Sequence, residues 1–160
     1  MKTKIGVLSD THLHEVTPDF KRIYDTYLSD KDVIIHAGDL ISPEIIDFLS
    51  KKEFHGVHGN MDPAEVRALL AEKKVIQLGN YRVGIMHGWG TSNGLEDRIR
   101  REFAGVDAIV YGHSHSPANK IREGVLLFNP GTATGFSFTG AHTIGILELD
   151  ETISGKIITF

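Results

Sequence analysis

The chain has 160 residues, of which 41% are hydrophobic and 24% are charged, and its formal net charge is −4. We expect one globular domain over residues 1–160, built around a single core. The sequence contains nine histidines and no cysteine, which excludes disulfides, thiolate metal sites and cysteine nucleophiles. The negative net charge does not indicate a groove for nucleic acid, and we expect no stable nucleic-acid binding.

We expect neither a signal peptide nor a membrane-spanning segment in this sequence. The first apolar stretch, residues 5–8, is too short for the core of a signal peptide. No apolar run approaches the ~20 residues needed to span a bilayer. We therefore expect a cytoplasmic protein that does not contact a membrane.

The first two thirds of the chain alternate between short apolar runs and helical patterns. Three helix starts combine an N-cap residue with proline, at Thr17-Pro18, Ser42-Pro43 and Asp62-Pro63, and Ser92 or Asn93 is expected to cap a fourth helix. The alternation predicts βαβ units in a mainly parallel sheet. The apolar runs have strand length, are rich in Val and Ile, and cover residues 5–8, 33–36, 54–57, 75–78, 83–87 and 106–111.

The last third of the chain has a different pattern. Short apolar segments at residues 120–122, 125–128, 143–149 and 153–159 follow one another through Gly-rich turns, without helices between them. Strands connected in this way pair antiparallel, so we expect a second sheet that is antiparallel or mixed. The resulting α/β sandwich does not by itself indicate a function.

Polar residues follow five successive apolar runs in the same way. In open α/β sheets, binding sites form beyond the carboxyl ends of the strands. Any one of these residues alone more often has a structural role. Together they supply seven donors, namely three side-chain oxygen donors and four imidazoles, and such a set suits two metal ions that share a carboxylate. The donors are Asp10, His12, Asp39, Asn60, His87, His113 and His115.

These five motifs, in this order, resemble those of the calcineurin-like metallophosphoesterase superfamily. The motifs D-x-H, G-D, G-N, H and G-H-x-H begin here at Asp10, Gly38, Gly59, His87 and Gly112. The short length, the G-N-x-D sequence and the turn at residues 129–131 resemble one branch, the small bacterial and archaeal phosphodiesterases related to vacuolar protein sorting 29. The resemblance implies a four-layer α/β/β/α sandwich with two mixed β-sheets.

The resemblance also implies a set of metal ligands and a reaction. A hydroxide that bridges two divalent ions would attack a phosphodiester, and Asp39, Asn60 and His87 would be the catalytic residues. We expect Mn²⁺, with Ni²⁺, Fe²⁺, Zn²⁺ and Co²⁺ left open, because no thiolate selects a softer metal. One ion would take Asp10, His12, Asp39 and His115, and the other would take Asp39, Asn60, His87 and His113.

The sequence departs from the superfamily pattern at two positions. Met61 stands where many members carry a histidine that protonates the leaving group, and Leu13 replaces a common glycine. A methionine cannot transfer a proton, so the departure favours diesters with a good leaving group, or another acid such as His14 or His58. A phosphomonoesterase or nucleotidase remains an alternative. So does a protein-binding scaffold like vacuolar protein sorting 29.

Several residues near these motifs allow both a functional and a structural interpretation. His36, His58 and Asp62 are expected close to the site, where they would orient ligands, although Asp62 is also the expected cap of the helix at Pro63. Trp89, in a Gly-rich loop, could line a substrate pocket or simply pack. Asn129 is expected in a turn beneath the site. Homo-oligomerisation is left open.

Overall fold

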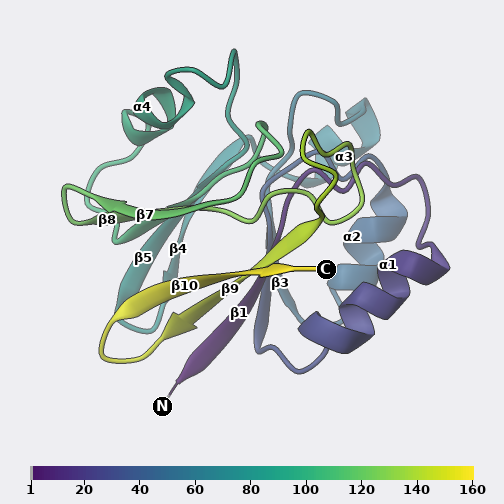
Figure 1. Cartoon of the computed structure of the whole chain (residues 1–160), viewed down its shortest axis with the longest axis horizontal. Helices are drawn as coiled ribbons and strands as arrows, with labels where there is room; N and C mark the ends of the chain where they lie inside the picture. Colours follow the sequence, from purple (N-terminus) through teal and green to yellow (C-terminus); the bar gives the residue numbers. More distant parts are fainter. Residues whose placement is uncertain (1) are drawn as a thin grey trace.

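Two five-stranded β-sheets face each other and carry helices on their outer sides (Figure 1). This arrangement is seen in a computed structural model that describes residues 2–160. It confirms the expected α/β fold with two mixed sheets. The helices are α1 (Pro18–Ile23), which continues as a π-helical turn (Tyr24–Leu28), α2 (Pro43–Leu49), α3 (Ala64–Leu69) and α4 (Leu95–Arg100).

The first sheet has the strand order β10-β9-β1-β2-β3. Its strands are β1 (Thr3–Leu8), β2 (Val33–His36), β3 (Glu53–Gly56), β9 (Thr143–Leu149) and β10 (Ile153–Thr159). The strands β1, β2 and β3 are parallel, whereas β9 and β10 add antiparallel to β1. Parallel pairing places the carboxyl ends of β1, β2 and β3 at the same edge of the sheet.

The second sheet has the order β4-β5-β6-β8-β7. Its strands are β4 (Lys73–Leu78), β5 (Tyr81–Met86), β6 (Ala108–Val110), β7 (Ala118–Arg122) and β8 (Val125–Asn129). Here β5, β6 and β8 are parallel, and the hairpins put β4 and β7 antiparallel on the two edges. The carboxyl ends of β5 and β6 therefore also share one edge.

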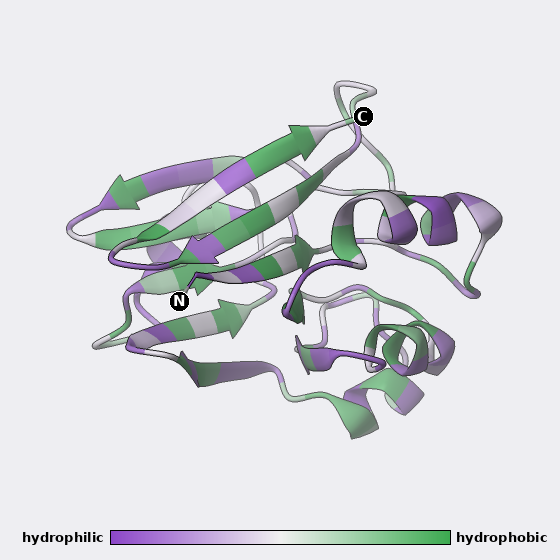
Figure 2. Cartoon of the chain, turned by 90° about the horizontal axis from the view of Figure 1, so that it is seen from below, coloured by the Kyte–Doolittle hydropathy of each residue, from purple (hydrophilic) through white to green (hydrophobic). Residues whose placement is uncertain are grey.

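The main core lies between the sheets. It is formed by buried aliphatic residues of both sheets, among them Ile5, Val7, Ile85 and Val110, together with Phe128. Figure 2 shows hydrophobic and hydrophilic residues alternating along several strands, as expected for strands that face the core on one side. Strand β2 is buried at every position, because the helices cover its other face.

The helix starts confirm part of the sequence prediction. Thr17 accepts a hydrogen bond from the backbone N–H of Phe20, and Ser42 accepts one from Glu44. The predicted cap at Asp62 is wrong, since Pro63 is the N-cap of α3 and the Asp62 carboxylate binds other backbone groups.

The predicted cap of α4 is also wrong. Its N-cap is Gly94, with φ of 78°, and neither Ser92 nor Asn93 caps it with a side chain. The guanidinium of Arg98 donates instead to the carbonyls of Trp89 and Asn93. These contacts hold the loop before α4 against the helix.

The C-terminal strands do not form a sheet of their own. Strands β7 and β8 complete the second sheet, whereas β9 and β10 join the first. Strand β9 is buried at six of its seven positions, which suits a place between β1 and β10 rather than at an exposed edge. Among residues 2–160, no helix has the length and apolar character needed to cross a bilayer.

Candidate metal centre

The seven expected ligands all follow the carboxyl ends of parallel strands. Asp10 and His12 follow β1, Asp39 follows β2 and Asn60 follows β3, all in the first sheet. From the second sheet, His87 directly follows β5, and His113 and His115 follow β6. The distances below show that these side chains, contributed by both sheets, meet at one place.

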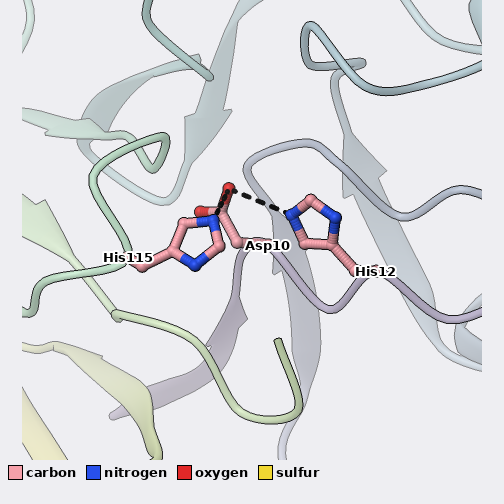
Figure 3. Close-up of side chains that lie close together, drawn as sticks. All are labelled: Asp10, His12 and His115. Carbon is pink, nitrogen blue, oxygen red and sulfur yellow. Dashed lines mark ion pairs between the residues drawn. The ribbon is translucent and has the colours of Figure 1, made fainter. Parts of the chain in front are cut away.

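The first cluster consists of Asp10, His12 and His115 (Figure 3). The Nε2 atom of His115 lies 3.4 Å from Asp10 Oδ1, and Nε2 of His12 lies 3.9 Å from the same oxygen. Both imidazoles point toward the buried carboxylate from opposite sides. One ligand atom from each residue lies within 4.8 Å of the others, a spacing that one cation could bridge.

The second cluster consists of Asp10, Asp39 and His87. The Nε2 atom of His87 lies 3.3 Å from Asp39 Oδ2 and 3.6 Å from Asp10 Oδ1. Asp39 Oδ2 is also 3.5 Å from Nε2 of His12. The Asp39 carboxylate thus faces one imidazole from each of the two expected ligand sets, as a bridging ligand must.

Asn60 extends the second cluster toward His113. Its Oδ1 atom lies 3.0 Å from Nε2 of His87 and 3.2 Å from Nδ1 of His113. The Nδ1 atom of His87 is 2.8 Å from the Ala37 carbonyl, and Nε2 of His113 is 2.7 Å from the Gly90 carbonyl. Each imidazole therefore donates its N–H to a backbone carbonyl, and its free nitrogen faces the Asn60 oxygen. Two acceptors facing each other call for a cation or a proton between them.

His115 is held in the same way. Its Nδ1 atom is 2.5 Å from the carbonyl of Phe136, so Nε2 is the nitrogen that faces Asp10. A metal-binding histidine usually donates its second nitrogen to such an acceptor, which selects the tautomer and orients the ring.

Within residues 2–160, two buried polar atoms of the cluster have no hydrogen-bond partner. These are Asp10 Oδ1 and His12 Nε2. An unpartnered buried polar atom costs about 1–3 kcal/mol, so such atoms are rare unless an ion or water satisfies them. Carboxylate, amide and imidazole donors form a set that suits borderline divalent metals. The residues present therefore fit a divalent cation.

The protonation states are coupled to this geometry. Burial disfavours the charged form of Asp10, but contacts with the imidazoles of His115 and His12 outweigh it and lower the pKa of the carboxyl. Burial also disfavours the charged form of His87, yet the carboxylates of Asp39 and Asp10 raise its pKa above the usual value. Without a cation, a proton on His87 takes the position between these oxygens.

Five of the seven expected ligands have left-handed backbone conformations. Their φ values lie between 50° and 72°, a region that residues other than glycine seldom adopt, although Asp and His tolerate it better than most. Such strain costs about 1–3 kcal/mol per residue and tends to gather at functional sites. The residues are Asp10, His12, Asp39, His113 and His115.

Asp62 lies next to the cluster but does not touch a ligand imidazole. Its carboxylate accepts hydrogen bonds from the backbone N–H groups of Asp39, Ile41 and Gly59, at 2.7–2.8 Å. It therefore ties the loop of Asp39 to the loop of Asn60. Its role in orienting the ligands stays a prediction, and its hydrogen bonds within residues 2–160 go to these backbone groups.

His36 is fully buried beneath the loops that carry the ligands. Its Nδ1 atom accepts from the backbone N–H of Gly38, and Nε2 lies 3.0 Å from the Thr11 hydroxyl. Burial lowers the pKa of His36 to about 3, so it stays neutral. Its contacts orient the backbone on either side of the cluster, while the ring itself faces no ligand side chain at hydrogen-bond distance.

The remaining candidates are placed as follows. His58 is half-buried and lines a hollow together with Asn60 and His87, whereas His14 is exposed. Asn129 is buried, and its amide donates to the Gly112 carbonyl and to the Ser114 hydroxyl. It thereby holds the loop that carries His113 and His115.

Other supporting residues were missed by the sequence analysis. The Ser9 hydroxyl donates to Asp10 Oδ2, and the Thr132 hydroxyl donates to the Asp10 carbonyl. The guanidinium of Arg67 donates to the carbonyls of Gly59, Asn60 and Asp62. Only Ser9, adjacent to a motif, carried a sequence signal, because the other contacts span long stretches of chain or depend on loop conformation.

Relatives of known sequence match nearly the whole chain. A probable metallophosphoesterase of Methanocaldococcus jannaschii is 34% identical over 159 residues, covering 96% of this chain and 80% of the relative. A phosphodiesterase of the same organism is 29% identical over 167 residues, covering 92% of this chain and 94% of the relative.

Solved structures show the same fold. An archaeal phosphodiesterase superposes with a TM-score of 0.78 at 25% identity, covering 99% of this chain and 100% of the other. Vacuolar protein sorting 29 of Cryptosporidium parvum superposes with a TM-score of 0.74 at 24% identity, covering 99% and 98%. At this identity the second likeness concerns the fold alone. The calcineurin-like phosphoesterase superfamily domain matches residues 3–152, and the chain belongs to that superfamily of metallophosphoesterases.

Proposed function

We propose that the protein hydrolyses phosphodiesters at a dinuclear metal centre. The observation that carries the proposal is the pair of buried, unpartnered atoms, Asp10 Oδ1 and His12 Nε2, inside a cluster of carboxylates and imidazoles. One ion would be held by Asp10, His12, Asp39 and His115, and the other by Asp39, Asn60, His87 and His113. We propose Mn²⁺ as the metal, with Ni²⁺, Fe²⁺, Zn²⁺ and Co²⁺ as alternatives.

Divalent ions at such a site neutralise phosphoryl charge and supply a nucleophile from water at neutral pH. The protein residues hold the site in shape for this reaction. Asp10 stays ionised because its pKa is lowered, and the backbone carbonyls of Ala37, Gly90 and Phe136 fix three imidazoles. Asn60 and His87 lie where they can orient the phosphoryl oxygens.

Met61 favours diesters over substrates that need a general acid. Its side chain is 59% exposed beside Asn60, and only its backbone takes part in the site, donating to Asp39 Oδ1 at 2.8 Å. A thioether cannot protonate a leaving group. The protein would therefore act on esters whose leaving group departs as a stable anion.

Two alternatives remain to be tested against this proposal. A phosphomonoesterase or nucleotidase would cleave p-nitrophenyl phosphate faster than its diester. A binding scaffold is suggested by the fold shared with vacuolar protein sorting 29, and such a protein would cleave neither ester.

The decisive experiment compares bis-p-nitrophenyl phosphate with the monoester for protein loaded with Mn²⁺. We expect the diester to be preferred. Asp39→Asn, which keeps the shape of the side chain and removes its charge, should lower kcat more than ~100-fold and reduce bound metal, since even residues behind the ligands contribute 10–100-fold. Asp47→Asn, an exposed carboxylate on α2, is the matched control. Full activity in Asp39→Asn would overturn the proposal.

A further inference from the structure

We propose that the hollow beside Asn60 and His87, walled by Trp89, is a subsite for a nucleobase, so that the substrate is a phosphodiester of a nucleoside. This inference rests on the proposed hydrolytic function and names the class of substrate for the same site. The hollow has a volume of about 220 Å³. Because Asn60 and His87 also belong to the candidate metal centre, the hollow opens directly onto the place where a phosphate would bind.

The backbone around Trp89 holds this residue in an exposed position, and Trp89 takes no part in the buried core. The indole side chain is 44% exposed, and none of the buried hydrophobic clusters found within residues 2–160 includes it. Two glycines with positive φ, Gly88 at 105° and Gly90 at 83°, flank it. The Arg98 guanidinium donates to the Trp89 carbonyl from Nε and Nη2, at 3.0 and 2.8 Å. The loop is thus fixed while the aromatic side chain stays available.

An available indole beside a phosphate site is suited to stacking. Bases stack on aromatic side chains, and each stacked base contributes about 1–3 kcal/mol. The size of the hollow also favours one ring system. Pockets for larger ligands occupy about 300–1,000 Å³, so this one is too small for a peptide segment or an extended lipid chain.

The polar side chains that line the hollow favour a base over a phosphate as the ligand. Glu72 contributes a carboxylate, which repels a phosphate but accepts hydrogen bonds from ring N–H or amino groups. His58 adds an imidazole to the lining. Arg67, also in the lining, uses its guanidinium on the carbonyls of Gly59, Asn60 and Asp62. A neutral base is therefore favoured in the hollow, and the phosphate is favoured at the metal centre.

Trp89 is the only tryptophan of the chain, so its fluorescence reports on this hollow alone. The full-length protein with Mn²⁺ would be titrated with adenosine 5′-monophosphate, and separately with ribose 5-phosphate and inorganic phosphate. We expect saturable quenching by the nucleotide and little change with the two probes that lack a base. Equal quenching by all three probes, or no quenching by the nucleotide, would overturn the subsite. This readout does not depend on catalysis.

A kinetic experiment separates the subsite from the hydrolytic function. Thymidine 5′-(p-nitrophenyl) phosphate and methyl p-nitrophenyl phosphate have the same leaving group, and only the first carries a base. We expect Trp89→Ala to raise KM about tenfold for the thymidine ester and to leave the methyl ester unchanged, with Trp89→Phe in between. Ile121→Ala, which removes an exposed apolar side chain from β7, is the control.

The outcomes are distinguishable. An equal effect of Trp89→Ala on both esters would overturn the subsite and leave the hydrolytic function standing. Failure of the wild-type protein to cleave either ester with any of the metals would overturn the proposed function, whereas base-dependent quenching would then show a nucleotide-binding site without hydrolysis.

Discussion

The carboxylate of Asp62 lies 2.8 Å from the backbone nitrogen of Asp39, which precedes it by 23 residues. The same carboxylate accepts from the backbone N–H groups of Gly59 and Ile41. Asp62 thus acts as a cross-link between the loop after β2 and the loop after β3. Because Asp39 and Asn60 are carried by these loops, their relative position depends on a side chain that would not itself bind metal.

Asp62→Ala should destabilise the fold and weaken metal binding together. It leaves three backbone N–H groups without their acceptor, which should lower the free energy of unfolding by about 3 kcal/mol. Asp62→Asn keeps one oxygen acceptor and should lose about half of that. Urea unfolding of metal-free protein measures the first effect, and titration with Mn²⁺ measures the second. Asp47→Ala is the control, and unchanged stability in Asp62→Ala would contradict this role.

His36 should make the metal-free protein sensitive to mild acid. Burial lowers the pKa of His36 to about 3 in the folded state, against about 6.5 when unfolded. Between these values the unfolded chain binds the extra proton, so stability decreases as the pH falls below about 6.5. From pH 7 to pH 5, the wild type should lose about 2 kcal/mol more than His36→Gln. Parallel losses in the two proteins, measured by urea unfolding with a chelator present, would contradict the assignment.

Metal affinity should decrease as the pH falls, because protons compete for His87. The pKa of His87 is raised in the metal-free protein, where its charged form gains from Asp39 and Asp10 despite burial. That stabilisation is complete below the unfolded pKa near 6.5 and is lost as the pH rises through the raised value. A cation must displace the proton, so affinity should fall about tenfold per pH unit below the raised pKa for each proton released.

The measurement is the increase in Tm produced by Mn²⁺ at pH 8 and at pH 6, each compared with chelator-treated protein. Asp10 does not add to the difference, because its lowered pKa keeps it ionised at both pH values. A smaller increase at pH 6 is expected. Identical increases would show that His87 releases no proton on metal binding.

Met61→His should extend the reaction to poorer leaving groups. The side chain is exposed beside Asn60, so the substitution should be tolerated. A general acid contributes about 10²–10⁴-fold where the leaving group needs a proton. We expect kcat/KM for an alkyl diester to rise at least ~10-fold, with little change for the p-nitrophenyl diester. Met61→Gln has a similar size and no titratable group, and an equal gain in that variant would exclude proton transfer as the cause.

Much of the fold could be predicted from the sequence because its signals are local. Strand β2 and strands β9 and β10 have the predicted boundaries, and the Thr17 and Ser42 caps are where the patterns indicated. The sequence also predicts that the motif residues lie close together, because parallel strands bring their carboxyl ends to the same edge of a sheet. Their roles as metal ligands stay a prediction.

Contacts between distant segments could not be predicted. Nothing local to β9 shows that it pairs with β1 and leaves β7 and β8 to the other sheet. Asp62 had the sequence signature of a helix cap, yet the fold brings it better partners, namely the free N–H groups of a loop more than twenty residues away. Arg67 carried no signal, since its acceptors are carbonyls of a loop whose conformation the sequence does not specify.

The two sheets contribute separate halves of the candidate centre. Asp10, His12, Asp39 and Asn60 come from one sheet, and His87, His113 and His115 come from the other. A cation bound between the two sheets would link the N-terminal strands to strands from the middle of the chain through coordinate bonds. In a protein without cysteine, such an ion would be the reversible counterpart of a disulfide, and its release would loosen the two sheets from each other at the edge that carries the candidate centre.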